Sequence, residues 1–211
     1  MPTSHFKGDL SNEGILGTFL DGYYKQAFQN SKYSVKRITD IDLQHRGVDL
    51  ELSTGNKTLY IDEKAQLDYL NQSLPTFAFE LSYLKNGKWT KGWLFDKHKL
   101  THIYFLITDI HTLQGNDISK GLSKLKITGV YRDKLIALLE RKGLTETRLY
   151  ELEKVYRANQ ESGKITIKEL NPTGEGTFYF SKDSKHEQPM NLVLKLKFLV
   201  ESGIGKLIFS L

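Results

Sequence analysis

Asp49, Asp62 and Lys64 are the residues whose types and spacing could do chemistry in this chain. Twelve residues separate Asp49 from the tripeptide Asp62-Glu63-Lys64. Carboxylate oxygens are ligands for Mg²⁺, which acts as a Lewis acid and lowers the pKa of its bound water. A lysine beside such a centre can position the attacking water or stabilise developing negative charge. Together, these side chains would suit the hydrolysis of a phosphodiester bond.

Two predicted strands must position these residues. The segments 48–52 and 59–64 alternate apolar and polar residues, which is typical of strands. A turn that contains glycine and asparagine joins them and predicts a hairpin. Side chains alternate between the faces of a strand, so Asp62 and Lys64 share one face and Glu63 points to the other.

The context of the acid-x-Lys tripeptide matters more than the tripeptide itself. The chain contains two others, Glu140-Arg141-Lys142 and Asp183-Ser184-Lys185. The first ends a predicted helix and the second lies in a predicted loop. Only Asp62-Glu63-Lys64 follows an apolar strand whose hairpin partner also carries an acid.

The segments Gly47-Val48-Asp49 and Ile61-Asp62-Glu63-Lys64-Ala65-Gln66 resemble the core of the PD-(D/E)xK nuclease superfamily. This superfamily includes restriction endonucleases and Holliday-junction resolvases. In it a helix precedes a sheet, the first acid lies on the second strand, and the acid-x-Lys sequence lies on the third. The predicted order here is the same. Val48 stands where the superfamily has proline, which is a common departure.

The resemblance implies a metal site built from these residues. Asp49 and Asp62 would bind Mg²⁺, or Mn²⁺ in its place, with help from the Glu63 carbonyl group. Lys64 would assist the attacking water. The implied activity is that of a Mg²⁺-dependent deoxyribonuclease, an endonuclease in type, with DNA as its partner. Members often act as dimers, which suggests a homodimer here.

The resemblance also implies two supporting residues. Gln66 matches a polar residue that orders the site in some members. Glu13, in the first predicted helix, matches an acid that adds a metal contact in others.

Each of these residues also fits a purely structural role. Lys64 could pair across the hairpin with Asp49. Glu13 could act as a capping acid, and Gln66 as a polar residue at the end of a strand. A bulge in the second strand would bring the Glu63 side chain into the site in place of its neighbour.

Apolar periodicity predicts an α/β fold. The resemblance implies a restriction-endonuclease-like core at 1–112, which a C-terminal α+β portion at 113–211 would follow. The core would be a central mixed sheet flanked by helices, the first of them over 12–29. The C-terminal portion would pack on the same domain. Its predicted elements are helices at 131–142 and 145–158, and strands at 164–169, 177–181, 191–200 and 206–209.

Composition excludes several classes of protein. Hydrophobic residues make up 39% and charged residues 26%, as in ordinary globular proteins. The absence of cysteine excludes disulfides, thiolate zinc sites and a cysteine nucleophile. The polar N-terminus predicts no signal peptide, and no apolar run is long enough for a membrane span, which together predict a cytoplasmic protein. No phosphate-binding loop or nucleophile elbow is present.

A basic, aromatic segment leaves two readings open. Five lysines surround Trp89 and Trp93 on a predicted hairpin; these are Lys85, Lys88, Lys91, Lys97 and Lys99. The segment could be an arm that contacts phosphates and offers aromatic platforms. It could equally be an amphipathic hairpin with core tryptophans and solvated lysines.

Two other functions remain compatible with the sequence. The net charge of +5 permits a polyanionic partner without requiring one. The chain could therefore be a nucleic-acid-binding protein that keeps the nuclease fold without catalysis. It could also be an interaction protein whose basic surface binds an acidic partner.

Overall fold

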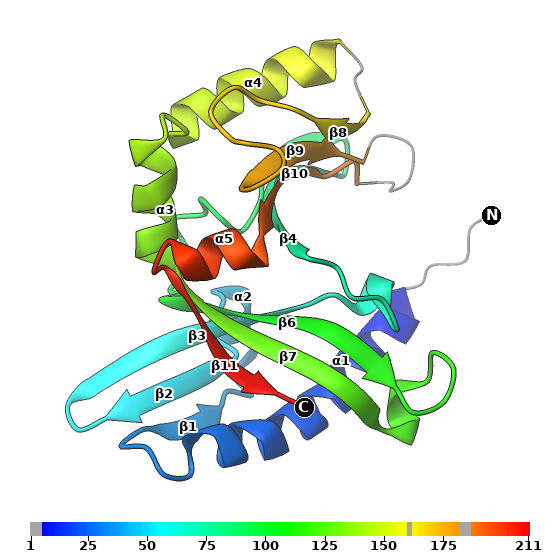
Figure 1. Ribbon diagram of the computed structural model, residues 1–211, viewed down its shortest axis with the longest axis vertical. Helices are drawn as coiled ribbons and strands as arrows, with labels where there is room; N and C mark the ends of the chain where they lie inside the picture. Colours follow the sequence, from blue (N-terminus) through cyan, green and yellow to red (C-terminus); the bar gives the residue numbers. More distant parts are fainter. Residues whose placement is uncertain (1–5, 160–161, 182–186) are drawn as a thin grey trace. The chain divides into compact units, whose positions relative to one another are not determined.

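The computed structural model describes residues 6–159, 162–181 and 187–211, and its chain forms two compact units (Figure 1). The chain leaves unit 1 for unit 2 twice, so neither unit is continuous in sequence. This division does not follow the predicted boundary at residue 112. Unit 1 comprises Met1–Leu74, Leu100–Val130 and Lys206–Leu211, and unit 2 comprises Pro75–Lys99 and Tyr131–Gly205.

Unit 1 is built on a six-stranded mixed sheet with the strand order β1-β2-β3-β6-β7-β11. The first three strands are antiparallel neighbours, whereas β3 pairs in parallel with β6. The prediction of an α/β protein with a mixed sheet is confirmed. The strands are β1 (Ser34–Arg37), β2 (Leu50–Thr54), β3 (Lys57–Ala65), β6 (Ile103–Thr112), β7 (Leu122–Tyr131) and β11 (Gly205–Ser210).

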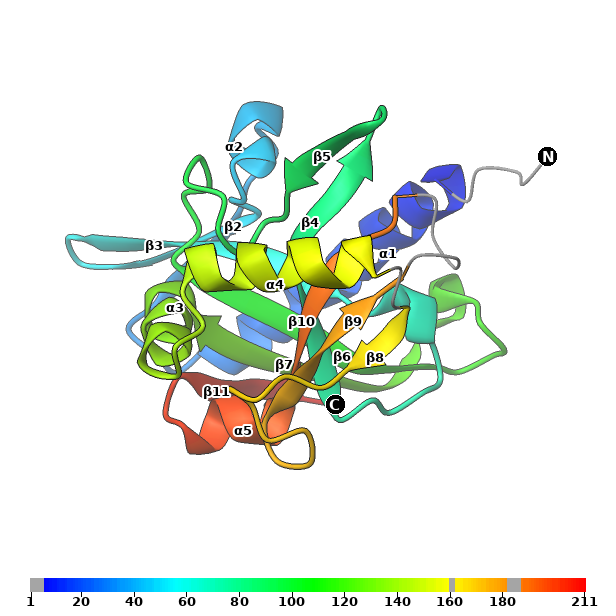
Figure 2. The same cartoon turned by 90° about the horizontal axis from the view of Figure 1, so that it is seen from above.

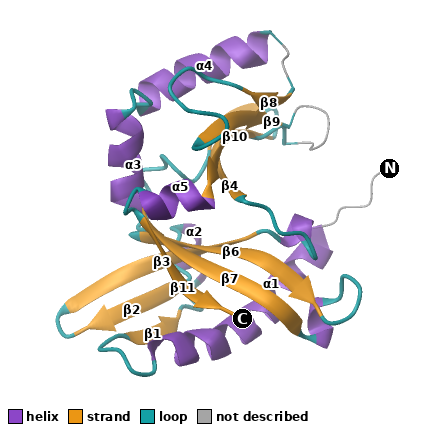
Figure 3. Ribbon diagram, in the orientation of Figure 1, coloured by secondary structure: helices purple, strands orange, loops and turns teal. Residues whose placement is uncertain are grey.

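Helix α1 (Phe6–Phe28) packs along one face of this sheet (Figure 3). Its inward residues Leu16, Leu20 and Tyr24 recur at helical spacing and are almost fully buried. They belong to the same apolar cluster as Leu50 of β2 and Ile61 of β3. The α1 helix therefore covers the hairpin that carries the predicted site.

A short helix and a glycine set the direction in which the chain enters β2. Helix α2 (Ile41–His45) is capped by the Asp40 side chain, which accepts a hydrogen bond from the Leu43 N–H. Gly47 then has a φ of 73°, a conformation that glycine adopts without strain. Its carbonyl accepts a hydrogen bond of 2.9 Å from the Thr101 hydroxyl. This turn places Asp49 directly before β2.

Strand β7 corrects the prediction from the sequence, in which no strand covers Leu122–Tyr131. The burial pattern explains the omission, because lysines alternate with apolar residues only in its first half. Lys124 and Lys126 both pair with Asp109 of β6, at 3.2 and 3.0 Å. Two short 3-10 helices complete unit 1: η1 (Leu67–Tyr69) and η2 (Ile118–Lys120).

Unit 2 contains a five-stranded antiparallel sheet with the order β5-β4-β10-β9-β8. Its β4–β5 hairpin turns at Asn86 and Gly87, which both have positive φ, as is typical of a tight asparagine-glycine turn. The strands are β4 (Thr76–Lys85), β5 (Lys88–Lys91), β8 (Gly163–Ile165), β9 (Gly176–Phe180) and β10 (Met190–Lys195).

The helices of unit 2 are α3 (Arg132–Arg141), α4 (Glu146–Ala158) and α5 (Leu196–Glu201). In Figures 1 and 2, α4 lies alongside the five-stranded sheet, and the ring of its Tyr156 lies 6.0 Å from that of Phe178. The strand predicted over 191–200 is wrong in its second half, because β10 ends at Lys195 and α5 follows directly.

Among the helices of the described residues, none combines the length and the apolar character that crossing a bilayer requires.

Candidate active site

Asp49 is fixed to both neighbouring strands by its backbone and side chain. Its N–H donates to the Ile61 carbonyl, and its own carbonyl accepts from the Ile38 N–H, both at 2.8 Å. Its Oδ2 accepts a 2.7 Å hydrogen bond from the Glu63 N–H. The carboxylate therefore lies against the backbone of β3, beside the acid-x-Lys tripeptide.

Asp62 and Lys64 lie on the same face of β3, as the strand alternation predicts. The Lys64 ammonium donates a hydrogen bond to Asp62 Oδ1. Asp62 is only 1% exposed, because β6 runs beside it and Tyr104 is its register partner. Its Oδ2 is buried and has no hydrogen-bond partner among the described residues. A buried carboxylate oxygen without a partner is costly, so the site has an unmet demand for positive charge or a donor.

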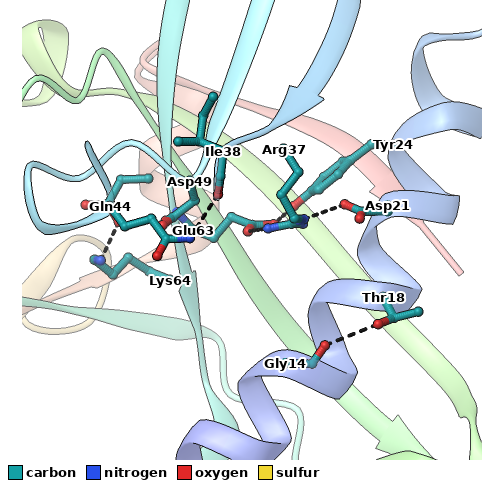
Figure 4. Close-up of polar contacts among 11 residues, drawn as sticks. Gly14, Thr18, Asp21, Tyr24, Arg37, Ile38, Gln44, Asp49, Glu63 and Lys64 are labelled. Carbon is teal, nitrogen blue, oxygen red and sulfur yellow. Dashed lines mark hydrogen bonds and ion pairs between the residues drawn. The ribbon is translucent and has the colours of Figure 1, made fainter. Parts of the chain in front are cut away.

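The Glu63 side chain is held by two residues of other elements, Tyr24 and Arg37 (Figure 4). The Tyr24 hydroxyl of α1 donates to Glu63 Oε1 at 2.5 Å, and Arg37 Nη1 of β1 donates to Oε2 at 2.6 Å. Arg37 Nε also donates to Asp21 at 2.6 Å. Burial, and next the Glu63 carboxylate, raise the pKa of Tyr24 well above its usual range, so the hydroxyl keeps its proton.

The alternative with a bulged strand is wrong. Residues Ile61–Ala65 pair one for one with Ile103–Ile107 of β6, without a shift in register. Glu63 therefore cannot take the place of Asp62, and its side chain serves Arg37 and Tyr24.

The predicted residues line one cavity of about 560 Å³ in unit 1. Asp49, Asp62 and Lys64 are on its wall, and Glu13 reaches it from α1, where its side chain is exposed. The wall also contains apolar groups and Arg37, one of the two residues that hold Glu63. The lining residues are Glu13, Gly14, Leu16, Gly17, Thr18, Leu20, Asp21, Arg37, Gln44, His45, Asp49, Asp62, Glu63, Lys64, Ala65 and Ile107.

Gln66 is the predicted site residue that the cavity wall, as drawn by the described residues, does not include. Strand β3 ends at Ala65, and Gln66 takes the N-cap position of η1. Its N–H donates to the Ile107 carbonyl at 3.1 Å. The alternation of side chains along β3 therefore ends one residue before Gln66.

The surroundings of Asp49 favour its protonated form. Burial first, and next the nearby Asp62 charge, raise the pKa of Asp49 to about 7, although the hydrogen bond from the Glu63 N–H and the Lys64 charge act to lower it. Two carboxylates in one poorly solvated place resist double ionisation. A divalent cation would relieve that repulsion in the same way as a proton does.

Asp49 and Asp62 offer carboxylate oxygens, the kind of ligand that Mg²⁺ takes in proteins. Among the described residues, no three His, Cys, Asp or Glu side chains are grouped to hold a metal ion. Mg²⁺ usually takes one or two carboxylates and completes its octahedron with water and substrate phosphate. Asp49 and the free Asp62 Oδ2 meet that requirement, whereas Glu13 does not join them in a cluster of three.

Sequence reasoning missed the residues that support the site. Arg37, Tyr24 and Asp21 carry no motif, since each lies in an ordinary helix or strand pattern. The signal in the sequence was the helical spacing of Tyr24 behind Leu16 and Leu20, which places its ring on the covered face of α1.

Arg37→Met is expected to lower the free energy of unfolding by about 2–3 kcal/mol, because Glu63 and Asp21 would lose their shared cation while Glu63 stays mostly buried. Urea unfolding of the purified variant measures the change. Lys36→Met is the matched control, since Lys36 is the exposed neighbour on β1. An Arg37→Met protein as stable as this control would contradict the assignment of Arg37 to a structural role.

Comparison of the chain with models of known families, with curated proteins and with solved structures finds no match.

Proposed function

We propose that this protein is a Mg²⁺-dependent deoxyribonuclease that cleaves internal phosphodiester bonds of DNA. One observation carries the proposal: Asp49 and Asp62 meet on a single cavity wall, beside Lys64. One carboxylate has a buried oxygen without a partner in the described chain, and the other has a pKa of about 7. This pair is suited to a cation, and perturbed carboxylates in a cavity are typical of catalytic sites.

The order of elements in unit 1 supports a restriction-endonuclease-like core of the PD-(D/E)xK type. Helix α1 comes first, and β1, β2 and β3 follow as antiparallel neighbours. Asp49 directly precedes β2, and Asp62 and Lys64 lie on β3. The resemblance drawn from the sequence implies this order.

Different residues of the site would bind the metal ion and stabilise the reacting phosphate. Asp49 and Asp62 would hold the ion, and the Glu63 carbonyl is the further ligand that the resemblance implies. Bound Mg²⁺ would supply Lewis acidity and a water of lowered pKa. Because Lys64 occupies Asp62 Oδ1, Oδ2 remains as the ligand atom. The Lys64 ammonium also provides positive charge for the phosphate and for the attacking water.

The supporting residues keep Asp49 in place. Arg37 and Tyr24 fix the Glu63 side chain, and the Glu63 N–H in turn fixes the Asp49 carboxylate. Preorganised ligands lose little freedom when the ion and substrate bind. By the same resemblance, the proposal includes a homodimer that cuts both strands of DNA in the cytoplasm.

Incubation of supercoiled and linear plasmid DNA with the purified protein tests the proposal. We expect nicked and linear products with Mg²⁺ or Mn²⁺ and none with EDTA. Endonuclease action converts supercoiled circles, which have no ends, whereas an exonuclease would degrade only the linear DNA. Intact DNA in every metal condition would favour the alternative of a DNA-binding protein without catalysis.

If no DNA is cleaved, the protein either needs a particular DNA sequence or binds no metal. A thermal melt with increasing Mg²⁺ or Mn²⁺ distinguishes these two explanations. At about 100 times the Kd, binding should raise the Tm by about 5 °C or more. An Asp49→Asn variant should lose this rise. A Tm that no divalent cation changes would reject the metal site itself.

A further inference from the structure

Unit 2 contains a second cavity, of about 460 Å³, bounded by residues of β4, β5, α4 and the chain just after β5. This volume falls within the range of sites that bind small organic groups. It is separate from the aspartate site, and no residue lines both. The lining residues are Leu81, Ser82, Trp89, Thr90, Lys91, Phe95, Glu146, Thr147, Leu149, Tyr150 and Glu153.

Two large aromatic side chains on the cavity wall are unusually exposed. Trp89 of β5 is 52% exposed and Tyr150 of α4 is 56% exposed. Exposed aromatic rings forgo the burial that stabilises such residues in a core, and they are favourable platforms for a planar ligand. The Arg157 guanidinium lies over the Trp89 ring, 3.7 Å from its centroid, yet Arg157 does not line the cavity. Arg157 therefore covers one face of the Trp89 ring, and a ligand would stack on the other.

The polar wall of the cavity is buried and held in one arrangement. Ser82 is 7% exposed and Glu153 is 6% exposed. Glu153 Oε1 accepts hydrogen bonds from the Ser82 hydroxyl and, at 2.8 Å, from Arg157 Nε. Arg157 Nη2 donates to the Ser82 oxygen at 2.7 Å. The bonds from Ser82 and from Arg157 Nε both end on Glu153 Oε1. Oε2 is therefore the oxygen through which Glu153 could accept a hydrogen bond from a ligand.

The elements that bound the cavity carry several lysines, of which Lys91 lines the cavity itself. Lys85, Lys88 and Lys91 are exposed on the β4–β5 hairpin, and Lys154 lies over the Tyr150 ring, 4.4 Å from its centroid. Lys91 is partly neutralised by Glu146, at 2.5 Å. The remaining lysines offer contacts to the phosphates on either side of a bound nucleotide.

We propose that this cavity binds one unpaired base of a nucleic-acid strand. The base stacks on Trp89 and Tyr150, Glu153 accepts from an amino group on its edge, and the hairpin lysines contact the strand's phosphates. Cytosine, adenine and guanine offer such amino groups. Thymine binds more weakly, because two carbonyl oxygens that a carboxylate repels flank its single N–H. The inference goes beyond the proposed cleavage and depends on residues of unit 2 alone.

Tryptophan fluorescence tests this directly, because Trp89 and Trp93 are the two tryptophans of the chain. A Trp93→Phe background isolates the signal of Trp89. Titration in EDTA, which prevents Mg²⁺-dependent cleavage, uses single-stranded oligonucleotides of equal length made of dC, of dT, or of abasic units. We expect quenching by the dC strand, weaker binding of the dT strand, and no quenching by the abasic strand.

Variants assign the binding to the cavity, with fluorescence anisotropy of labelled dC strands as the readout. Trp89→Ala and Tyr150→Ala should each weaken binding about 5- to 100-fold, the cost of one lost stacking partner. Trp89→Phe should bind within a few-fold of wild type, which shows that loss of binding in the alanine variant is not loss of fold. Tyr179→Ala is the matched control, because Tyr179 is 42% exposed on β9 and does not line the cavity.

Several results would overturn the inference: equal binding of the abasic strand, unchanged binding by Trp89→Ala, or no binding of any strand. Binding of dCMP as tight as that of the strand would replace it with a site for free nucleotides. The Asp62→Asn variant should bind dC strands like wild type. Failure of the proposed cleavage and failure of the proposed base binding are therefore seen in separate measurements.

Discussion

Replacement of Asp62 by asparagine is expected to lower Mg²⁺-dependent cleavage of DNA by at least about 100-fold, the loss seen when one charge-stabilising group of a catalytic site is removed. The change keeps the side chain's shape but removes the charge that pairs with Lys64 and would hold the cation. Lys64→Ala should also lower cleavage strongly, while metal binding through the two aspartates is retained. Initial rates of plasmid nicking, with metal binding followed by thermal melts, give both quantities.

Glu140→Gln is the matched control for this experiment. Glu140 begins the other described acid-x-Lys tripeptide, on α3, and is exposed. The Glu140→Gln protein should cleave DNA at the wild-type rate. Retained cleavage in a folded Asp62→Asn protein would place the chemistry elsewhere or reveal a contaminating nuclease. Equal losses of cleavage in Asp62→Asn and Glu140→Gln would point to a general effect of removing one negative charge.

The metal-free protein is expected to become less stable as the pH rises from about 4 to 7, because of Asp49. Most carboxylates in folded proteins contribute to stability in the opposite sense. The pKa of Asp49 is raised to about 7 by burial and by the neighbouring Asp62 charge, so the folded protein holds a proton that the unfolded chain has released. The contribution of Asp49 to the free energy of unfolding is fully present below its pKa in the unfolded chain, near 4. This contribution is lost as the pH rises through its pKa in the folded protein, about 7. Each pH unit in this window costs up to about 1.4 kcal/mol.

Urea unfolding in EDTA at a series of pH values measures this slope. Asp49→Asn, which cannot titrate, should flatten it between pH 4 and 7. Saturating Mg²⁺ should also remove it, because the cation replaces the proton and binds less well when Asp49 is protonated. Carboxylates whose pKa is lowered, such as Asp109 and Glu175, act in the opposite sense and lose their contribution only in more acidic solution. A wild-type slope that Asp49→Asn leaves unchanged would contradict the assignment.

The site could be predicted from sequence where its geometry is local. Asp62 and Lys64 share a face because they are two residues apart on one strand, and Asp49 joins them because the hairpin register is set by a short turn. Gln66 is not on the cavity wall of the described residues, because β3 ends at Ala65 and the alternation of side chains ends with it. Arg37 and Tyr24 could not be predicted, because their meeting at Glu63 depends on how a helix and an edge strand pack.

The fold shows a similar limit. Helices α3 and α4 were predicted closely, because their apolar periodicity is long and glycine separates them. Strand β7 was not predicted, because its lysines alternate with apolar residues only in its first half, and their pairing with Asp109 depends on the tertiary structure. The assignment of 75–99 to the second unit has no local signal at all, since tertiary pairing of β4 with β10 decides it.

The interrupted path of unit 1 has a consequence for its biosynthesis. Strand β11 pairs with β7 but follows it only after the whole segment Tyr131–Gly205. A ribosome adds on the order of 5–20 residues per second, so the nascent sheet waits several seconds for its last strand. During that interval the outer edge of β7 has unpaired backbone groups, which invite mispairing with other nascent chains. Slower translation or a higher temperature should therefore reduce the yield of soluble protein more than the stability of the finished fold would suggest.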